Sequence, residues 1–309
     1  MTTTPHVSVI VAAYNCADTI ASCIESLLHQ NFPKASYDII VVDNNSTDQT
    51  RAIIQKYPVK YILEDQIQGP AAARNRGVLE VQTPFIAFLD SDQMADPMWL
   101  TNLITGFENM DYGAFGGLNQ FTKSPTPSAA YHIQVNERGV DLSDPQLNSH
   151  FNHKLGGGNS AYRKSVFDRL RGFDTNLFSS EDFDLVYRMQ DQLKLKVKFN
   201  PAIVWNRLRD NKQLLKREYR IGFGHALLKV KYPQMNLGPG VGKLIWRNLG
   251  RTLTGILASL KALFQRWPFP EKKLKIQLIF LDIAVKWMNI AGRIHYSLQL
   301  NKGKIPAHW

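Results

Sequence analysis

The sequence of 309 residues contains only two cysteines, Cys16 and Cys23. Two cysteines cannot form a disulfide framework, so we expect a protein of a reducing compartment. The N-terminal segment has no basic stretch followed by an apolar one, and no secretory signal is expected. The apolar run 276–290 has 15 residues and contains Asp282 and Lys286. It is shorter than the roughly 18 clean apolar residues that a membrane-spanning helix needs.

Several site motifs are also missing. The histidines and cysteines have no zinc-ligand spacing, no Ser-His-Asp arrangement can be argued, and no Gly-rich Walker loop is present. What remains is a globular composition, with 44% hydrophobic and 20% charged residues. The length is sufficient for one large α/β domain with an appendage, or for two modest domains.

Acidic residues become scarce in the C-terminal part of the chain. Residues 1–193 contain 14 basic and 22 acidic side chains, whereas residues 194–309 contain 23 basic and 4 acidic ones. An acidic N-terminal part binds polyanions poorly unless a metal intervenes. The strongly basic C-terminal part favours a phosphate-bearing partner, either nucleic acid or a membrane surface.

Strand and helix patterns alternate over the first ninety residues. Continuous apolar runs are typical of strands buried on both faces of a parallel sheet, and apolar residues at helical spacing predict the intervening helices. This order predicts an α/β fold with right-handed crossovers. Ser46 with Gln49 predicts a capping box at the start of the second helix. The expected strands cover residues 7–12, 37–42, 59–63 and 85–89, and the expected helices include 20–28, 70–80 and 181–192.

Polar residues follow three of these strands. In open α/β sheets the ligand crevice lies beyond the carboxyl ends of the strands, where Tyr14, Asp43, Asp90 and Asp92 are expected. Two carboxylates at i and i+2 can face a hard divalent cation that also bridges to substrate phosphates. An isolated Asp-x-Asp is more often a helix cap beside a solvated charge. Residues 118–154 are expected to form a long loop or small insertion over the crevice.

Asp90 and Asp92 are part of a set of six motifs that occur in a characteristic order. This set weighs against the interpretation of the two aspartates as a helix cap beside a solvated charge. The six motifs are VIVAAYN (9–15), VVDNNSTD (41–48), AARNRG (72–77), DSD (90–92), GGN (157–159) and EDFDL (181–185). With these motifs the chain resembles the glycosyltransferase family 2 enzymes over roughly residues 5–230. The resemblance implies the GT-A fold, a Rossmann-like and mostly parallel α/β sheet flanked by helices.

The resemblance implies a nucleoside diphosphate sugar bound over the first two strands. The backbone near Ala12 and the ring of Tyr14 correspond to base and ribose contacts. Asp43 corresponds to the carboxylate that accepts a hydrogen bond from the imide N–H of the base. The alternative is that Asp43 caps a helix. Arg74 resembles the arginine that approaches the base or diphosphate, a task that suits a guanidinium fork. The alternative is a surface arginine paired with Glu80 or Asp65.

The resemblance also implies a divalent cation, Mn²⁺ or Mg²⁺. Asp92 resembles the principal metal ligand, with Asp90 nearer the ribose. Such a cation offsets the charge of the departing diphosphate. Many relatives carry a metal-binding histidine after the strand that follows the Glu-Asp helix, but here the strand leads to Trp205-Asn206. Asn206 or an additional water would then replace the histidine.

By the same resemblance Asp182 is the general base that deprotonates the acceptor hydroxyl, and the anomeric configuration is inverted. Its neighbour Glu181 is the alternative base, since geometry decides such questions. Gly157 and Gly158, followed by Asn159, allow the backbone to approach a sugar closely. The alternative is an ordinary tight turn before a strand.

The basic tail has an amphipathic helix pattern. Over residues 243–267 a narrow cationic stripe faces a wide apolar face, as in helices that lie in the plane of a membrane. Pro268 and Pro270 are expected to end this helix, and a second is expected from Lys272. The alternatives are that both helices pack on the protein, or that they bind nucleic acid, for which no module is recognisable.

The sequence therefore predicts a catalytic domain of residues 1–232, with a nucleotide-sugar half (1–117) and an acceptor half (118–232), followed by the tail 233–309. The expected function is transfer of a sugar to a hydroxyl of a lipid-linked or polysaccharide acceptor. The expected donor is a UDP-sugar, and the alternatives are a GDP-sugar and a dTDP-sugar. We expect this at the cytoplasmic face of the membrane, without nucleic acid. The alternatives are a catalytically silent membrane scaffold and a sugar-nucleotide pyrophosphorylase, whose Gly-rich N-terminal phosphate loop is lacking here.

Overall fold

The computed structural model describes residues 7–121, 155–177, 179–207, 209–234, 240–264 and 269–301. Their packing gives two compact units. The first holds the strands and extends to Arg207; the second holds the helices α8 (Asn211–Lys231), α9 (Val241–Phe264) and α10 (Phe269–Asn301). Packing thus places α8 with the C-terminal helices, whereas the sequence-based division ended the catalytic domain after it.

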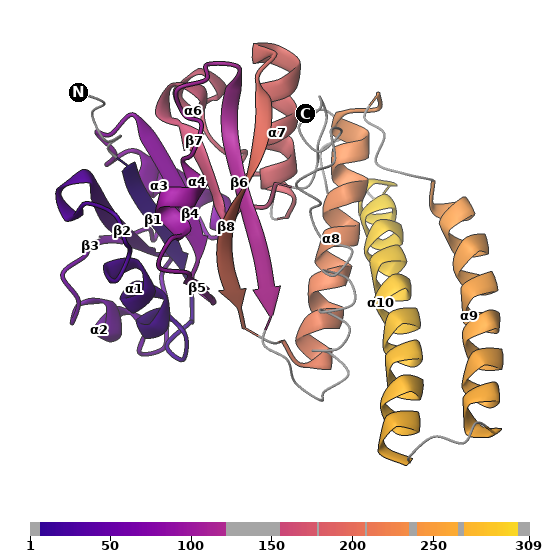
Figure 1. The fold of residues 1–309 in the computed structure, drawn as a ribbon. Helices are drawn as coiled ribbons and strands as arrows, with labels where there is room; N and C mark the ends of the chain where they lie inside the picture. Colours follow the sequence, from indigo (N-terminus) through magenta and orange to yellow (C-terminus); the bar gives the residue numbers. More distant parts are fainter. Residues whose placement is uncertain are drawn as a thin grey trace. The chain divides into compact units, whose positions relative to one another are not determined.

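The first unit is built on an eight-stranded sheet with the order β3-β2-β1-β4-β7-β6-β8-β5 (Figure 1). The strands are parallel from β3 to β4 and antiparallel in the pairs β4–β7, β6–β7 and β5–β8. The four expected strands are confirmed to within one residue at either end. The strands are β1 (Val7–Ala13), β2 (Tyr37–Asp43), β3 (Lys60–Leu63), β4 (Phe85–Asp90), β5 (Gln93–Ala95), β6 (Tyr112–Phe121), β7 (Ser160–Arg163) and β8 (Lys196–Asn206).

Helices cover both faces of this sheet, because β1 is apolar on both sides. Val9 and Val11 point into the core shared with α1, α2 and α4, while Ile10 points into the core shared with α3, α6 and α7. This is the three-layer arrangement expected for a buried parallel sheet. The helices are α1 (Ile20–Leu28), α2 (Thr50–Ile54), α3 (Pro70–Val78), α4 (Trp99–Leu103), α6 (Lys164–Leu170) and α7 (Glu181–Leu193).

The loops after β1 and β2 are joined to each other. The Ser46 hydroxyl accepts from the backbone N–H of Asn15 at 3.0 Å, and the N–H of Ser46 donates to Asp43 Oδ1 at 3.0 Å. Helix α2 begins only at Thr50, whose N–H donates to Asp48 Oδ1 at 2.9 Å, and the N-cap residue is Gln49. The predicted capping box at Ser46 is therefore wrong, because contacts between the loops occupy the serine. These contacts fix the strand ends that Tyr14 and Asp43 flank.

Two further expectations bear on the first unit. Cys16 and Cys23 are buried and form no disulfide, as expected. The segment expected to be a loop from residue 118 instead begins in β6, which continues to Phe121. The rest of that predicted loop, 122–154, lies outside the described residues.

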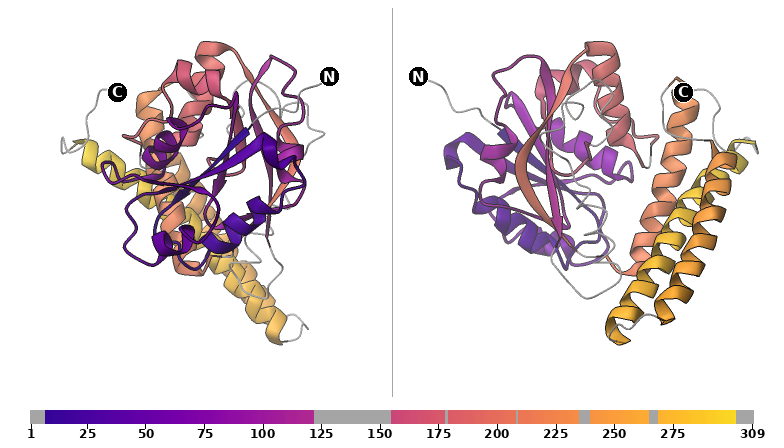
Figure 2. Two further views of the ribbon diagram at one scale, coloured as in Figure 1. Left: turned by 90° about the vertical axis from the view of Figure 1, so that its left-hand side faces the viewer. Right: turned by 45° about the vertical axis from the view of Figure 1, so that its right-hand side comes forward.

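In the second unit, α10 packs along both α8 and α9 (Figures 1 and 2). A Cβ on Gly222 would lie 1.9 Å from the carbonyl oxygen of Asn289, and a Cβ on Gly292 would lie 2.1 Å from that of Tyr219. Only glycine permits this approach of the α8 and α10 backbones. The α8–α10 pair is thereby held at short distance.

The start of α10 corrects one expectation. The helix begins at Phe269, not at Lys272, and includes Pro270 in its first turn. Proline is tolerated there because the first N–H groups of a helix have no intrahelical partner. Among the helices that the structure describes, none combines the length and the apolar character needed to cross a bilayer.

Candidate active site

Arg74, on α3, is the centre of a buried charge cluster. Its Nη2 donates to Asp90 Oδ1 and its Nη1 to Glu181 Oε1, both at 2.8 Å. The guanidinium also lies over the ring of Phe173, 5.6 Å from the centroid. Burial alone would lower the pKa of Arg74, but the two carboxylates raise it, so the guanidinium stays charged. The alternative of a surface arginine paired with Glu80 is therefore wrong.

Asp182, in the first turn of α7, lies beside this cluster. Its Oδ2 accepts from the N–H of Gly157 and its Oδ1 from the N–H of Phe183, both at 2.8 Å. Burial and the negative charge of Glu181 raise the pKa of Asp182 to about 7, against the lowering effects of Arg74 and the two N–H groups. A carboxylate with such a pKa can accept a proton near neutral pH, which suits a general base.

Sequence reasoning missed one residue of this neighbourhood, Tyr162 on β7. Its hydroxyl is buried and has no hydrogen-bond partner among the residues that the structure describes. Burial and the charge of Asp182 raise the pKa of Tyr162, so it remains a protonated donor. An aromatic residue in a strand is typical of a core, and nothing in the local sequence distinguishes this hydroxyl.

The backbone at Gly157 and Gly158 lies so close to the charge cluster that no side chain larger than that of glycine fits there. A Cβ on Gly157 would lie 2.7 Å from Arg74 Nη1, and one on Gly158 would lie 2.3 Å from Asp90 Cγ. At Gly156 the nearest atom would be 3.8 Å away. The glycine segment therefore packs over Arg74 and Asp90. Six of the predicted site residues are thus brought together: Arg74, Asp90, Gly157, Gly158, Glu181 and Asp182.

Gly158→Ala should displace the Asp90 carboxylate, whereas Gly156→Ala should be tolerated. We expect Gly158→Ala to destabilise the fold by about 1–3 kcal/mol through overpacking and to weaken nucleotide binding. Thermal unfolding with and without UDP and Mn²⁺ measures both effects. Equal behaviour of the two variants would show that the approach to Asp90 is unimportant.

Asn159 has a structural role. Its side chain accepts from Trp99 Nε1 at 2.8 Å and donates to the carbonyl oxygens of Leu118 and Ala202 at 3.1 and 3.3 Å. It is 3% exposed and has a positive φ of 63°. Because these bonds join β6 and β8 to the glycine segment, we leave Asn159 out of the ligand-binding set proposed below.

Asn206, the expected substitute for a metal-binding histidine, is engaged elsewhere. In the β5–β8 pair it lies opposite Gln93, whose Nε2 donates to Asn206 Oδ1 at 2.9 Å. Gln93 Oε1 in turn accepts from the N–H of Asp90 at 3.1 Å. Asn206 therefore holds the turn that carries the two aspartates, and its amide oxygen already has a donor.

The two aspartates of this turn fit a divalent cation only in part. The Asp90 side chain is 38% exposed, and one of its oxygens is taken by Arg74. Asp92 follows two residues later and is partly exposed. Within the described part of the chain, no group of three His, Cys, Asp or Glu side chains could hold a metal ion. Two carboxylates suit a cation that takes its other ligands from water and a diphosphate.

The residues expected to bind the nucleotide lie at one edge of the sheet. Ala12 is paired with Val42 and Asp90 on the neighbouring strands, and Tyr14 is 51% exposed. Asp43 is buried, and its Oδ2 accepts from the hydroxyl of Tyr61 at 3.2 Å. Each carboxylate oxygen of Asp43 retains a lone pair for a further donor.

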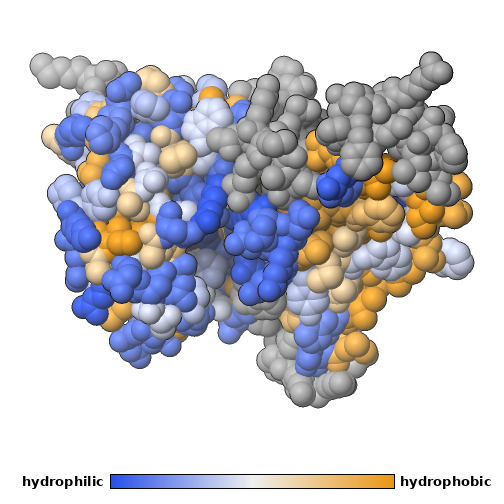
Figure 3. All heavy atoms as spheres, turned by 90° about the horizontal axis from the view of Figure 1, so that it is seen from below, coloured by the Kyte–Doolittle hydropathy of each residue, from blue (hydrophilic) through white to orange (hydrophobic). Residues whose placement is uncertain are grey.

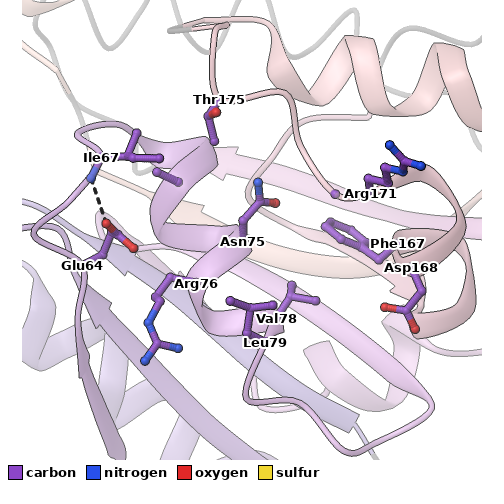
Figure 4. Close-up of a pocket in the computed structure, with 12 residues that line it drawn as sticks. Glu64, Ile67, Asn75, Arg76, Val78, Leu79, Phe167, Asp168, Arg171 and Thr175 are labelled. Atoms are coloured by element: carbon purple, nitrogen blue, oxygen red, sulfur yellow. Dashed lines mark hydrogen bonds between the residues drawn. The ribbon is translucent and has the colours of Figure 1, made fainter.

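A separate cavity of about 480 Å³ lies beside another face of α3 (Figure 4). Its walls include the apolar side chains of Ile67, Val78 and Phe167 and the polar side chain of Asn75. Asn75 is bonded to the backbone of Phe173. None of the predicted site residues lines this cavity, so it is distinct from the Arg74 cluster.

Known sequences resemble this chain. The Glycosyl transferase family 2 profile matches residues 8–171, more than half of the chain. Glycosyltransferase AglE of Haloferax volcanii is 29% identical over 229 residues, 72% of this chain and 73% of that protein. Poly(ribitol-phosphate) beta-N-acetylglucosaminyltransferase TarS of Staphylococcus aureus is 40% identical over 90 residues, 28% of this chain. The chain spans only 16% of the length of TarS.

Solved structures resemble the fold. Mannosyltransferase PcManGT from Pyrobaculum calidifontis, in complex with GDP-Man and Mn²⁺, matches 99% of this chain and 78% of its own with a TM-score of 0.60 and 18% identity. TarS 1–349 in complex with UDP-GlcNAc matches 96% of this chain and 92% of its own with a TM-score of 0.53 and 19% identity. At such identities the likeness shows the fold alone, and it confirms the expected GT-A architecture. The chain belongs to glycosyl transferase family 2.

Proposed function

We propose that this chain transfers a sugar from a nucleoside diphosphate sugar to an acceptor hydroxyl, with inversion at the anomeric carbon. The observation that carries the proposal is the bridge made by Arg74. It links Asp90, at the strand end expected to face the donor, to Glu181, the neighbour of the expected base. In this proposal the donor and acceptor sides of the transfer site are joined by the ion pairs of Arg74.

We propose a UDP-sugar as the donor. The ring of Tyr14 is exposed for stacking beside the base, and Asp43 offers a buried carboxylate to a base imide. Arg74 would attract the diphosphate by its charge, while Gly157 and Gly158 let the backbone pack closely over Arg74 and Asp90. The two solved structures contain GDP-Man and UDP-GlcNAc. An experiment must therefore first determine whether this chain prefers a uridine or a guanosine nucleotide.

Asp92 and Asp90 would hold the divalent cation, Mn²⁺ or Mg²⁺. When bound, the cation would supply Lewis-acid stabilisation of the leaving diphosphate. Asp90 is positioned for this by Arg74 and Gln93, which fix its side chain and its backbone. These contacts orient the carboxylate before the ligand arrives.

Asp182 is the proposed general base. The N–H groups of Gly157 and Phe183 hold its two oxygens, and its raised pKa favours proton acceptance. Glu181 is the weaker candidate, because its Oε1 is already bonded to Arg74 and its side chain is 8% exposed. Asp182 would take the proton of the acceptor hydroxyl as that oxygen attacks the anomeric carbon.

The proposed acceptor is a hydroxyl on a lipid-linked or polysaccharide chain at the cytoplasmic face of the cell membrane. TarS is a relative whose name specifies a poly(ribitol-phosphate) acceptor. The strong positive charge of residues 194–309 supports a partner surface that is anionic. We propose no nucleic-acid partner, because the basic residues alternate with bulky aliphatic ones.

A thermal-shift screen with UDP, GDP and dTDP, each with and without Mn²⁺, tests the donor and the cation. A nucleotide that binds only the folded state raises the unfolding midpoint. We expect the largest shift for UDP with Mn²⁺, and we expect Asp92→Ala to abolish the Mn²⁺-dependent part. Asp191→Ala, an exposed aspartate at the other end of α7, is the control. Metal-stimulated UDP binding that survives in Asp92→Ala would exclude Asp92 as a metal ligand, and a larger shift with GDP would reassign the base.

A further inference from the structure

Helix α9 is oriented with its small and polar residues inward. Asn248 and Ser259 are 4% and 7% exposed, the Thr252 side chain contacts α10, and the backbone of Gly255 faces α10. Amphipathic helices of globular proteins normally bury their large apolar residues instead. In α9 Leu244 is buried in this way at 8% exposed, but most of the large apolar residues with a described side chain are exposed.

The outer face of α9 consists of large apolar residues. At 100° per residue they cover an arc of about 100° around the helix. Hydrophobic side chains gather over the C-terminal helices in Figure 3. The outer face comprises Trp246 (76% exposed), Leu249 (46%), Leu253 (61%), Ile256 (42%) and Leu257 (57%).

Specific contacts hold α9 in this orientation. Trp287 Nε1 of α10 donates to the Thr252 hydroxyl at 3.0 Å. A Cβ on Gly255 would lie 2.8 Å from Ile283 Cδ1, so α10 packs directly against the helix backbone there. If α9 were rotated so that its outer face met α10, these contacts would be lost. Leucine side chains would then lie where α10 packs against the backbone of Gly255.

A cationic sector borders the outer face on one side. Lys243, Arg247 and Arg251 are exposed and lie about 80–160° from Leu253 around the helix. The sequence of α9 contains no Asp or Glu to neutralise them. The apolar face is therefore flanked by positive charge.

A buried arginine adds to this charge. Arg293 of α10 is 8% exposed and donates to Asn289 Oδ1 at 3.2 Å and to His225 Nδ1 at 3.0 Å. Burial and the nearby charge of Arg247 lower the pKa of Arg293. Arg293 is too buried to contact a lipid itself, but its charge adds to the positive potential around Arg247.

We propose that α9 lies in the plane of an anionic lipid bilayer, with its outer face in the acyl boundary and its cationic sector at the lipid phosphates. The proposal rests on the proposed function, which places the acceptor at a membrane, and it identifies the surface that makes the contact. A second copy of the chain fits this face less well, because pairing two outer faces would bring two cationic sectors together. Insertion into lipid satisfies both the apolar and the charged sector.

Vesicle sedimentation of the full chain tests the apolar part. With vesicles containing phosphatidylglycerol, we expect Leu253→Gln/Leu257→Gln to reduce binding about tenfold or more. The control is Leu79→Gln, which alters a 76% exposed leucine of the other unit and should bind as the wild type does. Wild-type binding by the double variant, or no binding by the wild type, would overturn the proposal.

The charged part is tested by replacing Lys243, Arg247 and Arg251 with Gln. At about 1 kcal/mol per basic residue near an anionic surface, we expect about 10²-fold weaker binding at low salt and a smaller difference at high salt. Lys56, Arg169 and Lys194, changed together to Gln, remove the same charge from exposed positions of the other unit and serve as control. Equal loss in both triple variants would mean that net charge alone, and not α9, directs binding.

Tryptophan fluorescence and the molecular mass in solution show whether lipid or a second copy of the chain covers the outer face of α9. We expect a blue shift on vesicle binding that Trp246→Phe removes. A dimer in solution that Leu253→Gln/Leu257→Gln dissolves would assign the face to a second copy and overturn the proposal. UDP binding measured without vesicles remains independent of these results, so the failure of the lipid contact and the failure of the proposed function are distinguishable.

Discussion

Asp182→Asn is expected to lower kcat by about 10² or more while leaving UDP affinity nearly unchanged. The amide keeps the shape of the carboxylate but cannot accept the proton of the acceptor hydroxyl. Calorimetric titration of UDP with Mn²⁺ and initial rates with a saturating acceptor separate the two effects. A variant that loses UDP affinity in proportion to kcat would assign Asp182 to donor binding instead.

Glu181→Gln is the matched variant for this prediction. Its carboxylate is neighbour to Asp182 but is bonded to Arg74, so we expect a smaller loss of kcat. If Glu181→Gln reproduces the loss of about 10² and Asp182→Asn does not, Glu181 is the base. Thermal unfolding of both variants shows whether either change acts through the fold.

The pH profile gives an independent signature. The charged and titratable groups around Asp182 are Glu181 on its own helix, Arg74 on α3 and Tyr162 on β7. Because the base must be ionised, kcat/KM should rise with pH through about 7. Glu181→Gln removes a charge that raises the pKa of Asp182, so this limb should move to lower pH. A profile that is flat between pH 5 and 9 would contradict the assignment.

The sequence was sufficient to predict the strand ends and the residues beyond them. Buried parallel strands leave continuous apolar runs, and the carboxyl ends of such strands meet at one edge. Asp43 and Asp90 could therefore be placed at that edge without coordinates. Helical spacing is similarly local, and Asp184 and Arg188, four residues apart on α7, form an ion pair at 2.7 Å.

Contacts between distant segments could not be predicted in this way. Arg74 and Glu181 are 107 residues apart, and no spacing rule relates them. The Ser46 capping box was wrong because a local pattern cannot reveal that the hydroxyl accepts from Asn15. The motif around Asn159 likewise does not show that its side chain accepts from Trp99. These contacts depend on the tertiary fold, which local patterns do not contain.

The tail shows the same limit. The helical pattern correctly separated a cationic stripe from an apolar face in α9. It could not show which side faces α10, because Asn248, Thr252 and Gly255 are too small to stand out in a hydropathy pattern. The inward orientation of these residues became visible only from their burial and their contacts.

Arg74→Met should be the most destabilising single change in the proposed site. The guanidinium is 7% exposed as a side chain and bonds two carboxylates, of which Glu181 is itself 8% exposed. Removing it leaves a buried negative charge without its partner, for which we expect a loss of about 3–5 kcal/mol in the free energy of unfolding. Denaturant unfolding measures this loss. The control is Arg76→Met on the same helix, whose pair with Glu80 is much more exposed and whose midpoint should change little.

A second substitution shows whether the unpaired carboxylate causes that loss. Without Arg74 the buried carboxylate of Glu181 has no cationic partner, and a buried charge without a partner is strongly unfavourable. Adding Glu181→Gln to Arg74→Met should restore part of the stability, because the buried charge is then absent. A double variant that is as unstable as the sum of the two single variants would show that Arg74 acts through packing against Phe173 and not through the charge of Glu181.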